Sequence, residues 1–483
     1  MSNLVFSGRV LDNVHGFIEY TETEECIIDT LLFKRLQSIK QLSIVNWVFP
    51  GSEHTRYVHS LGVMHIADRI AKRLELPENE RKIVRLAGLL HDIGHYPLSH
   101  VCELPYKNVL EAFPTENYCV DNNTKVKRQI DDLNDILTYK YMKKSQGCHH
   151  EKIGADIVLN NKEIRELIIK DCGESAPGII ADIIIGNTER TNPLLVQILH
   201  SELDADGIDY LMRDAMLAGT SFGAFELDQL IRCMCVGVVE GKQILCISPK
   251  GIAAADQYLI NKFFSYSQVV FNKHVTITEW MAEQVVNWMQ RNNAYFPRTE
   301  DLKQWVESEQ TSEKYLSFTD NYFWASLQNL LSNELYGVEP DFIKTFCRHL
   351  IHHSELKYEN GSELKFICDN NEQIKQRLRS EKCYAELDKM DDRIAIFAMR
   401  RMSKQIHYDD FENRILEQIQ KEKEETGDSI TEEQRTEYKV RLFSECICIK
   451  EDEKVSLLCD DERSLMRSLY SRTLAVFRLY KYE

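Results

Sequence analysis

The sequence predicts a mainly α-helical fold, in which a helical core with short β-hairpins is followed by a mixed α/β C-terminal lobe. Two observations carry this prediction. Apolar residues recur at helical spacing through most of the first 290 residues, as in "CIIDTLLFKRLQSIKQL" and "APGIIADIIIG". Alternating apolar residues mark only a few short segments, among them "CVGVVEGKQILCI", which predicts a hairpin.

The predicted elements follow one another in a simple order along the chain. Residues 5–20 contain short extended segments, and segments with helical periodicity then cover residues 26–42, 57–74, 86–93, 149–161, 176–186, 192–219 and 253–289. Residues 114–147 are polar and charged, which is typical of a surface excursion. We expect a strand at "RLFSECICIK" (441–450) and a closing helix from Asp461.

The chain of 483 residues is long enough for more than one structural unit. We expect residues 1–290 to form the helical core that carries the chemistry. Residues 291–483 then form a mostly helical C-terminal lobe, and we expect this lobe to serve oligomerisation or regulation.

The composition excludes several classes of function. A formal net charge of −17 repels nucleic acid, so a nucleic-acid partner is not expected. No apolar run reaches the roughly 18 to 20 residues of a membrane span, and the N-terminus lacks the pattern of a secretion signal. The 14 cysteines are scattered without a CxxC pair, which favours free thiols in a reducing compartment. We therefore expect a cytoplasmic protein without a membrane partner.

One segment, "RLAGLLHDIGHYPLSHVCE" (85–103), concentrates residues that can carry chemistry. A single histidine is more often a packed or solvated residue than a ligand, but this segment places His91, Asp92, His95 and His100 close together. On a continuous helix His91 and His95 share one face, and Asp92 lies beside them. A catalytic metal needs about three or four protein ligands. The candidates for the remaining positions are His54, His59, Asp204, Asp206, Asp209 and Asp214.

The order of the motifs extends this metal hypothesis to a family. "HTRYVHSLGV", "GLLHDIGHYPLSH", "HHE" and "LDADGIDYLMRD", in this order, resemble the HD-domain phosphohydrolases. Within them, the chain is most similar to the deoxynucleoside triphosphate triphosphohydrolases, which include bacterial dGTPases and the SAM-and-HD-domain protein. The likeness covers roughly residues 10–285.

The resemblance implies a metal-dependent reaction. It assigns one divalent ion, Mn, Fe or Mg, to His59, His91, Asp92 and Asp206. Such an ion lowers the pKa of a bound water and neutralises charge on a phosphoryl group. The implied reaction is attack of this water on the α-phosphorus of a deoxynucleoside triphosphate (dNTP), which yields a deoxynucleoside and inorganic triphosphate.

The resemblance also implies roles for side chains around the metal. His100 is the expected proton donor to the leaving nucleoside oxygen, and Glu103 orients it. His95 and His150 are expected to contact the phosphates or to complete the catalytic hydrogen bonds. The residues assigned to substrate binding are Arg56 for the phosphates, Gln41, Leu42, Tyr210 and Asp214 for the deoxyribose, and Lys273 and His274 for additional charge.

Two departures from the family pattern concern the recognition of substrate. Gly207 stands where a lysine or arginine usually follows the metal aspartate, and Phe271 stands where a tyrosine is expected. The lost cation must be compensated if triphosphate is to bind well. The sequence therefore leaves base preference open.

Regulation and assembly are expected by resemblance alone. The dNTPs are the expected substrates and also candidate allosteric ligands, because Asp29 of the family's allosteric site is retained. Lys34 and Gln37 differ from the positions that read an activating guanine, so the activating nucleotide is not predicted. A homo-oligomer, either a tetramer or a hexamer, is expected, as is a role in nucleotide metabolism or in limiting viral replication.

Two alternatives to a triphosphohydrolase remain open. Gly207 and Phe271 would also suit a phosphodiesterase or nuclease that acts on oligonucleotides or cyclic nucleotides. A nucleotide sensor without catalysis is the third reading, and His100 beside a complete ligand set argues against it. Hydrolysis assays with each substrate class separate the three.

Overall fold

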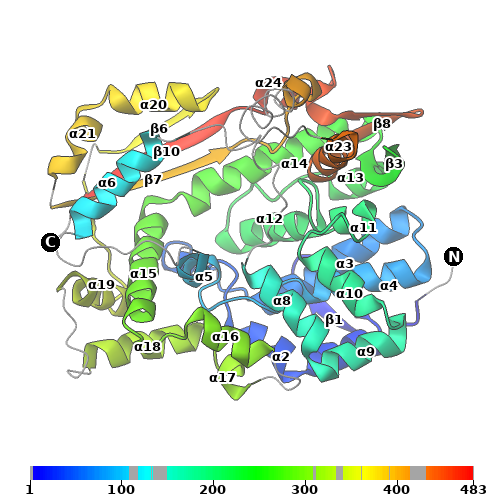
Figure 1. The fold of residues 1–483 in the computed structure, drawn as a ribbon, viewed down its shortest axis with the longest axis horizontal. Coiled ribbons are helices and arrows are strands. Elements are labelled where there is room, and N and C mark those ends of the chain that lie inside the picture. The colour runs from blue at the N-terminus through cyan, green and yellow to red at the C-terminus, as the bar shows by residue number, and fades with distance from the viewer. Residues whose placement is uncertain are drawn as a thin grey trace.

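The computed structural model describes residues 4–107, 118–131, 133, 149–307, 312–332, 341–359, 362–390, 392–413 and 431–481. These residues form a mainly helical molecule with three small sheets, which confirms the predicted fold class (Figure 1). None of the helices in these ranges combines the length and the apolar character needed to cross a bilayer.

The N-terminal part contains a cluster of helices, of which α3, α4, α8, α9 and α10 are seen at the lower right of Figure 1. Helices α3 and α4 pack against each other, α12 packs on α3, and α10 packs on α4. Their contact faces are almost entirely buried, because apolar residues recur every three or four positions along them. The elements of this part are β1 (Gly8–Asp12), β2 (Gly16–Tyr20), α1 (Glu22–Asp29), α2 (Leu31–Lys34), α3 (Arg56–Arg73), α4 (Glu78–Leu90), α5 (His100–Lys107), α6 (Tyr118–Asp131), α8 (His149–Asn160), α9 (Lys162–Cys172), α10 (Ala176–Ile184), α11 (Pro193–Gln197), α12 (Ala205–Ala218), α13 (Leu227–Cys233), β3 (Met234–Val239), β4 (Lys242–Ile247), α14 (Ile252–Ser265) and α15 (Lys273–Arg291).

The rest of the chain combines short helices with the strands of two sheets. Its elements are α16 (Thr299–Val306), α17 (Glu313–Leu316), α18 (Asp320–Ser332), α19 (Asp341–Ile351), β5 (Lys357–Tyr358), β6 (Leu364–Cys368), α20 (Asn371–Arg379), α21 (Lys382–Ala385), β7 (Arg393–Arg401), α23 (Glu432–Glu445), β8 (Cys448–Glu451), β9 (Lys454–Leu457), α24 (Met466–Leu469) and β10 (Thr473–Lys481).

The sheets connect the two parts of the chain. The predicted hairpin forms as β3 and β4, and β4 then pairs in parallel with β8 near the C-terminus. In the second sheet β10 pairs antiparallel with β5, β6 and β7. α6 packs on β7, where the side chain of Asn123 donates to backbone carbonyls and accepts from Ala395 N–H at 2.9 Å. Contacts therefore cross residue 290, and the division at that point stays a prediction.

Three expectations about local structure are wrong. α4 ends at Leu90, so residues 91–93 form a turn instead of extending the helix, and His95 does not share a helix with His91. Residues 432–445 are the helix α23, and only Cys448–Glu451 form the expected strand. The closing element is a strand, β10, in place of a helix. Most of the predicted surface excursion, 114–147, lies outside the described residues.

Candidate active site

Three helices bring the four predicted metal ligands together. α3 carries His59 on its buried face, and Asp206 lies in the first turn of α12. Because α4 ends at Leu90, His91 and Asp92 lie in the turn that follows it. The end of the helix therefore lets two successive side chains point to one place, which neighbouring positions on a continuous helix do not do.

Donor atoms of His59, His91 and Asp206 are spaced as ligands of one ion would be, and Asp92 lies beside them. Nε2 of His59 lies 3.0 Å from Oδ1 of Asp206 and 3.8 Å from Oδ2 of Asp92. Nε2 of His91 lies 3.5 Å from Oδ1 of Asp92 and 3.9 Å from Oδ1 of Asp206. Ligands bound to one ion at about 2.0 to 2.3 Å lie about 3 to 4.5 Å apart. One ligand atom each of His59, His91 and Asp206 lies within 4.8 Å of the other two, so these three residues could hold one divalent cation. Asp92 approaches His59 and His91 through different oxygens, and its place in the predicted ligand set stays a prediction.

Both imidazoles are oriented with Nε2 toward this point. Nδ1 of His91 is bound to the carbonyl oxygen of Gly88 at 2.8 Å, and its buried Nε2 has no hydrogen-bond partner among the described residues. A buried nitrogen without a partner is costly, and a metal ion would satisfy it. Nδ1 of His59 lies 2.7 Å from Oδ2 of Asp209, which is the arrangement that commonly orients a metal-bound histidine.

Asp209 is itself held by a buried network. His15 Nε2 lies 2.6 Å from Oδ1 of Asp209, and Arg213 donates to both of its oxygens at 2.9 Å. Arg213 also donates to Asp12 at 2.7 Å, so that it lies between two carboxylates. The residues at i and i+4, Asp209 and Arg213, thus form the structural pair that their spacing predicts. Rigid support of this kind fixes the direction of the His59 ring.

The other metal candidates from the sequence have different partners. Asp204 is the N-cap of α12 and accepts the N–H of Gly207 at 2.6 Å. His54 Nε2 lies 2.8 Å from Oδ1 of Asp214, and neither residue belongs to a metal-ligating group among the described residues. These residues therefore cap a helix or pair with each other.

The buried carboxylates at the site favour the binding of a cation. Burial lowers the pKa of His59, but hydrogen bonds with Asp206 and Asp209 raise it to about 10. Burial raises the pKa of Asp92, but the charge of Arg56, whose NH1 is 2.8 Å from Oδ2, holds it well below its usual range. In the free protein these carboxylates keep a proton on His59, and a divalent ion would displace it.

A second group of titratable side chains adjoins the first. Nε2 of His95 lies 3.9 Å from Oδ1 of Asp92. The fully buried Glu103 has Oε2 2.9 Å from Nδ1 of His100 and Oε1 2.9 Å from Nδ1 of His150. The rings of His95 and His150 stack with their centroids 4.2 Å apart. All four predicted catalytic residues therefore lie together beside the predicted ligands.

The environment sets the protonation of this group. Burial raises the pKa of Glu103, but hydrogen bonds with His100 and His150 lower it far below its usual range. Desolvation lowers the pKa of His95, which is therefore neutral near pH 7. The N–H of Tyr96 donates to Nδ1 of His95 at 3.1 Å, so the proton of the neutral ring is on Nε2. That buried N–H has no partner among the described residues and could donate to a ligand.

The turn that presents His100 has an unusual backbone. Leu98 and Ser99 have φ angles of 48° and 52°, a region that is costly for side chains with a Cβ. Asp320, at the start of α18, accepts the N–H of Leu98 at 2.7 Å and the N–H of Lys40 at 2.9 Å. The C-terminal part thus contributes a buried carboxylate that holds this turn in place.

A cavity of about 500 Å³ joins these groups to the predicted substrate residues. This volume is typical of a small-molecule site. The wall also includes residues 396–398 of β7, so both parts of the chain contribute to it. The predicted site residues that line it are Gln41, Leu42, Arg56, His100, Tyr210 and Asp214.

Lys273 and His274 are not brought into this cavity. Lys273 Nζ lies 4.8 Å from the ring centroid of Tyr358, and His274 pairs with Glu355. α15 begins at Lys273, and the side chains of its first two residues contact the C-terminal segment at 355–358. The structure therefore gives no support to their predicted role in charge compensation.

Sequence reasoning missed a different cation, Lys262 on α14. A Cβ placed on Gly207 would lie 3.1 Å from Nζ of Lys262, so this ammonium occupies the space beside the residue that follows Asp206. Lys262 is 8% exposed and donates to Tyr258 OH at 3.3 Å, and no carboxylate of the described chain lies within 4.0 Å of it. Burial lowers the pKa of Lys262, but the neighbouring acidic groups, Tyr258 and Asp204, raise it above its usual value, so it stays charged. The sequence did offer one indication of this cation, because Lys262 lies on the apolar face of a predicted helix, where a lysine is unusual.

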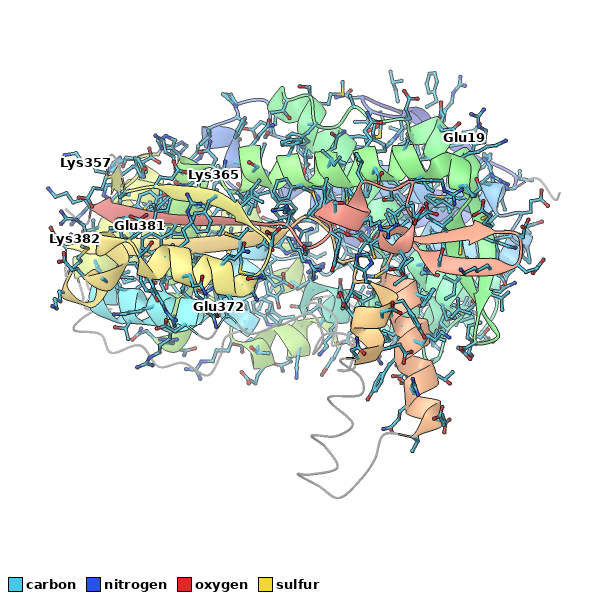
Figure 2. The ribbon with its side chains drawn as sticks, turned by 90° about the horizontal axis from the view of Figure 1, so that it is seen from above. Glu19, Lys357, Lys365, Glu372, Glu381 and Lys382 are labelled. Carbon is cyan, nitrogen blue, oxygen red and sulfur yellow. The ribbon has the colours of Figure 1, made fainter. Side chains whose placement is uncertain are left out.

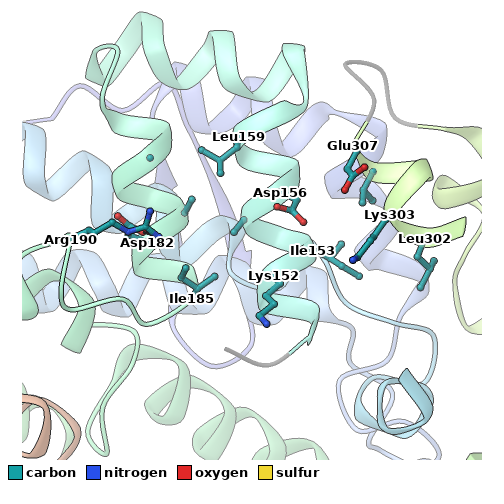
Figure 3. Close-up of a pocket in the computed structure, with 14 residues that line it drawn as sticks. Lys152, Ile153, Asp156, Leu159, Asp182, Ile185, Arg190, Leu302, Lys303 and Glu307 are labelled. Atoms are coloured by element: carbon teal, nitrogen blue, oxygen red, sulfur yellow. Dashed lines mark ion pairs between the residues drawn. The ribbon is translucent and has the colours of Figure 1, made fainter. Parts of the chain in front are cut away.

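A second cavity, of about 520 Å³, lies between α8, α10 and α16 (Figure 3). Lys152, Asp156, Asp182, Lys303 and Glu307 surround its apolar floor. None of the predicted site residues lines it, and the part of the chain that the structure describes shows no metal-ligating cluster there. Its size alone therefore does not make it the active site.

Comparisons with known proteins agree with this location. Residues 56–214 match the family model described as the HD domain. An uncharacterized protein of Methanocaldococcus jannaschii is 27% identical over 339 residues, which cover 68% of this chain and 61% of that protein. A Dictyostelium discoideum protein named deoxynucleoside triphosphate triphosphohydrolase SAMHD1 homolog is 35% identical over 176 residues, covering 32% of this chain and 33% of that protein.

A solved structure extends the similarity of fold to nearly the whole chain. A phosphohydrolase from Bacteroides thetaiotaomicron superposes with a TM-score of 0.60 at 19% identity, covering 98% of this chain and 99% of that one. The chain spans 47% to 61% of the length of the first curated relatives it matches. The matched HD region includes His59, His91, Asp92 and Asp206. Residues 56–214 are therefore similar to HD domains, and the family model does not extend over the rest of the chain.

Proposed function

We propose that this protein hydrolyses deoxynucleoside triphosphates to deoxynucleosides and inorganic triphosphate with the help of one divalent metal ion, Mn, Fe or Mg. One observation carries the proposal. The predicted metal ligands converge beside a cavity of about 500 Å³ whose wall holds the predicted sugar residues Gln41, Leu42, Tyr210 and Asp214. The residues predicted to bind metal, phosphate and sugar thus lie next to one another, which supports the proposal of a nucleoside triphosphate as substrate.

The ligand set fits a hard or borderline divalent ion, because it offers two imidazoles and two carboxylates. When bound, such an ion supplies a water of lowered pKa and neutralises charge on the phosphoryl oxygens.

The chain supplies further cations for the phosphates. Arg56 donates to Asp92 and also lines the cavity, so its remaining N–H groups can hold a phosphate oxygen. Lys262, which has no carboxylate partner in the described chain, replaces the cation that Gly207 lacks. This compensation removes the main argument for a phosphodiesterase or nuclease.

His100 is placed to protonate the departing 5′-oxygen. Its ring lines the cavity, and Glu103 holds Nδ1 at 2.9 Å, which leaves Nε2 for the substrate. Desolvation lowers the pKa of His100, whereas Glu103 and the bound phosphates raise it and favour the protonated donor. The proton on Nε2 of His95 can stabilise a phosphoryl oxygen in the same step.

The sugar end of the cavity favours deoxyribose. Leu42 would crowd a 2′-hydroxyl, and the carboxylate of Asp214 can accept the 3′-hydroxyl while the ring of Tyr210 covers the sugar. The His54 ring at 2.8 Å fixes the Asp214 carboxylate for this contact.

A product assay tests the proposal. The purified protein is incubated with Mn²⁺ and each dNTP, alone and in mixtures, and chromatography with ³¹P NMR identifies the products. We expect deoxynucleoside and inorganic triphosphate from the wild type and a loss of at least about a hundredfold in Asp206→Ala. Asp228→Ala, which changes an exposed carboxylate elsewhere, is the matched control.

Three outcomes would contradict the proposal. Release of nucleoside monophosphate and pyrophosphate would indicate another reaction. Faster cleavage of single-stranded or cyclic substrates would favour a phosphodiesterase or nuclease. Binding of dNTPs without turnover, unchanged in His91→Ala/Asp92→Ala, would favour a sensor.

A further inference from the structure

The wall of the substrate cavity that α15 forms carries two carboxyl groups that the proposed reaction does not use. Glu279 and Glu283 are one helical turn apart, and both line the cavity that Tyr210 and Asp214 also line. No hydrogen bond or ion pair joins either carboxyl group to another residue of the described chain. Both side chains are only partly exposed. The cavity therefore contains two acceptors without a donor.

The electrostatics of this pair are unfavourable in the free protein. Burial and the neighbouring Glu283 raise the pKa of Glu279 to about 8. Burial raises the pKa of Glu283 to about 7, although Lys125 on α6 opposes this effect. Unpaired acids in such surroundings are costly, and they mark candidate binding positions. A ligand that donates N–H groups would offset this cost.

The character of the wall indicates which part of a nucleotide lies against it. None of the metal-site residues is among the charges that act on the two carboxyl groups, so this wall is distinct from the end of the cavity that faces the metal site. Trp280, between them in sequence, lines the same cavity together with Ile396 and Phe397 of β7. An aromatic and apolar wall with two acceptors suits a heteroaromatic base.

We propose that Glu279 and Glu283 read the base of the nucleotide and select guanine over thymine. The inference rests on the proposed function, because it assigns the base end of the same site. A carboxylate accepts two parallel N–H groups, and guanine offers N1–H and N2–H side by side on one edge. Thymine offers a single N3–H between two carbonyl oxygens, which a carboxylate repels. Adenine and cytosine, whose amino group adjoins a ring-nitrogen acceptor, fall between the two.

Selectivity measurements on isosteric variants test the inference. kcat/KM for dGTP and dTTP is measured with Mn²⁺ for the wild type, Glu279→Gln, Glu283→Gln and the double variant. Glu372→Gln is the control, because Glu372 is exposed on α20, outside the cavity (Figure 2). We expect the wild type and the control to prefer dGTP over dTTP by about tenfold or more, because losing hydrogen bonds to a charged group costs about that factor. In the double variant we expect kcat/KM for dGTP and for dTTP to differ by less than about threefold.

A second measurement separates base reading from hydrolysis. Isothermal titration of the metal-free protein with deoxyguanosine and thymidine reports binding without phosphate, metal or turnover. We expect tighter binding of deoxyguanosine, lost in the double variant, with circular dichroism confirming that each variant folds. The single variants keep the test decisive if the double variant is unstable.

The outcomes distinguish the two proposals. Hydrolysis of dNTPs with a dGTP/dTTP ratio that the variants leave unchanged overturns the base inference and leaves the proposed function intact. No hydrolysis of any dNTP overturns the proposed function, and the nucleoside titration then decides the base inference by itself. Equal binding of the two nucleosides in the wild type overturns it.

Discussion

One added methyl group on α3 tests whether Asp209 orients His59 for a metal ion. In Gly62→Ala the new Cβ would lie 1.9 Å from Oδ1 of Asp209 and 2.5 Å from NH2 of Arg213. Real Cβ contacts do not fall below 3.0 Å. The carboxylate must therefore retreat by about 1 Å or more, because the packed interior offers no other adjustment. This substitution removes no charge and no hydrogen-bonding group.

The retreat should weaken the metal site measurably. It stretches the 2.7 Å contact between Oδ2 of Asp209 and Nδ1 of His59 beyond hydrogen-bond range. Loss of such an outer partner of a metal ligand costs about 10- to 100-fold in metal affinity. This corresponds to about 1.4 to 2.7 kcal/mol. Alanine has a better helix propensity than glycine, which stabilises the folded protein by up to about 1 kcal/mol. We therefore expect the substitution to weaken metal binding more than it weakens folding.

The assay compares Mn²⁺ dissociation constants by isothermal titration with melting temperatures. Gly178→Ala on α10 is the matched control, because its added Cβ would meet no atom within 4 Å among the described residues outside its own stretch of helix. We expect the control to bind metal like the wild type and to melt slightly higher. A folded Gly62→Ala protein with the wild-type dissociation constant would refute the role assigned to Asp209.

Three further predictions follow from other parts of the site and core. Lys262→Met should lower kcat/KM for dNTPs about 10- to 100-fold, because it removes a buried cation beside Gly207 that the proposed phosphate site uses; equal kcat/KM would contradict this. Leu42→Ala should raise the rate with ribonucleotides relative to dNTPs about tenfold by making room for a 2′-hydroxyl, measured as paired kcat/KM values. Burial raises the pKa of Asp68, but a hydrogen bond from Arg81 and the charge of Arg85 lower it to about 2. Because the folded pKa is depressed, this group contributes about 2 kcal/mol above pH 3.8 that is lost as the pH falls toward 2. Urea denaturation from pH 5 to 2 should show that loss in the wild type and not in Asp68→Asn.

Much of the site was predictable because its residues come from short, dense motifs. His91, Asp92, His95 and His100 lie within a few positions of each other, and a local cluster of this kind is visible without a structure. The sequence did not reveal the end of α4 at Leu90, because the apolar pattern of the helix continues to Ile93. The functional arrangement depends on that end.

The rest of the site depends on tertiary contacts that local patterns do not show. Lys262 reaches the space beside Gly207 only because α14 packs on α12, and Asp320 reaches the turn at Leu98 from a distant helix. β10 was predicted as a helix because it is buried on both faces and shows no alternation of polar and apolar residues.

An isotope experiment tests the central claim most directly. The wild-type protein is given a dNTP and Mn²⁺ in water enriched in ¹⁸O, and both products are analysed by mass spectrometry. Attack of water on the α-phosphorus predicts one ¹⁸O atom in the inorganic triphosphate and none in the deoxynucleoside. Label in the 5′-hydroxyl of the nucleoside, or a triphosphate without label, would contradict the account.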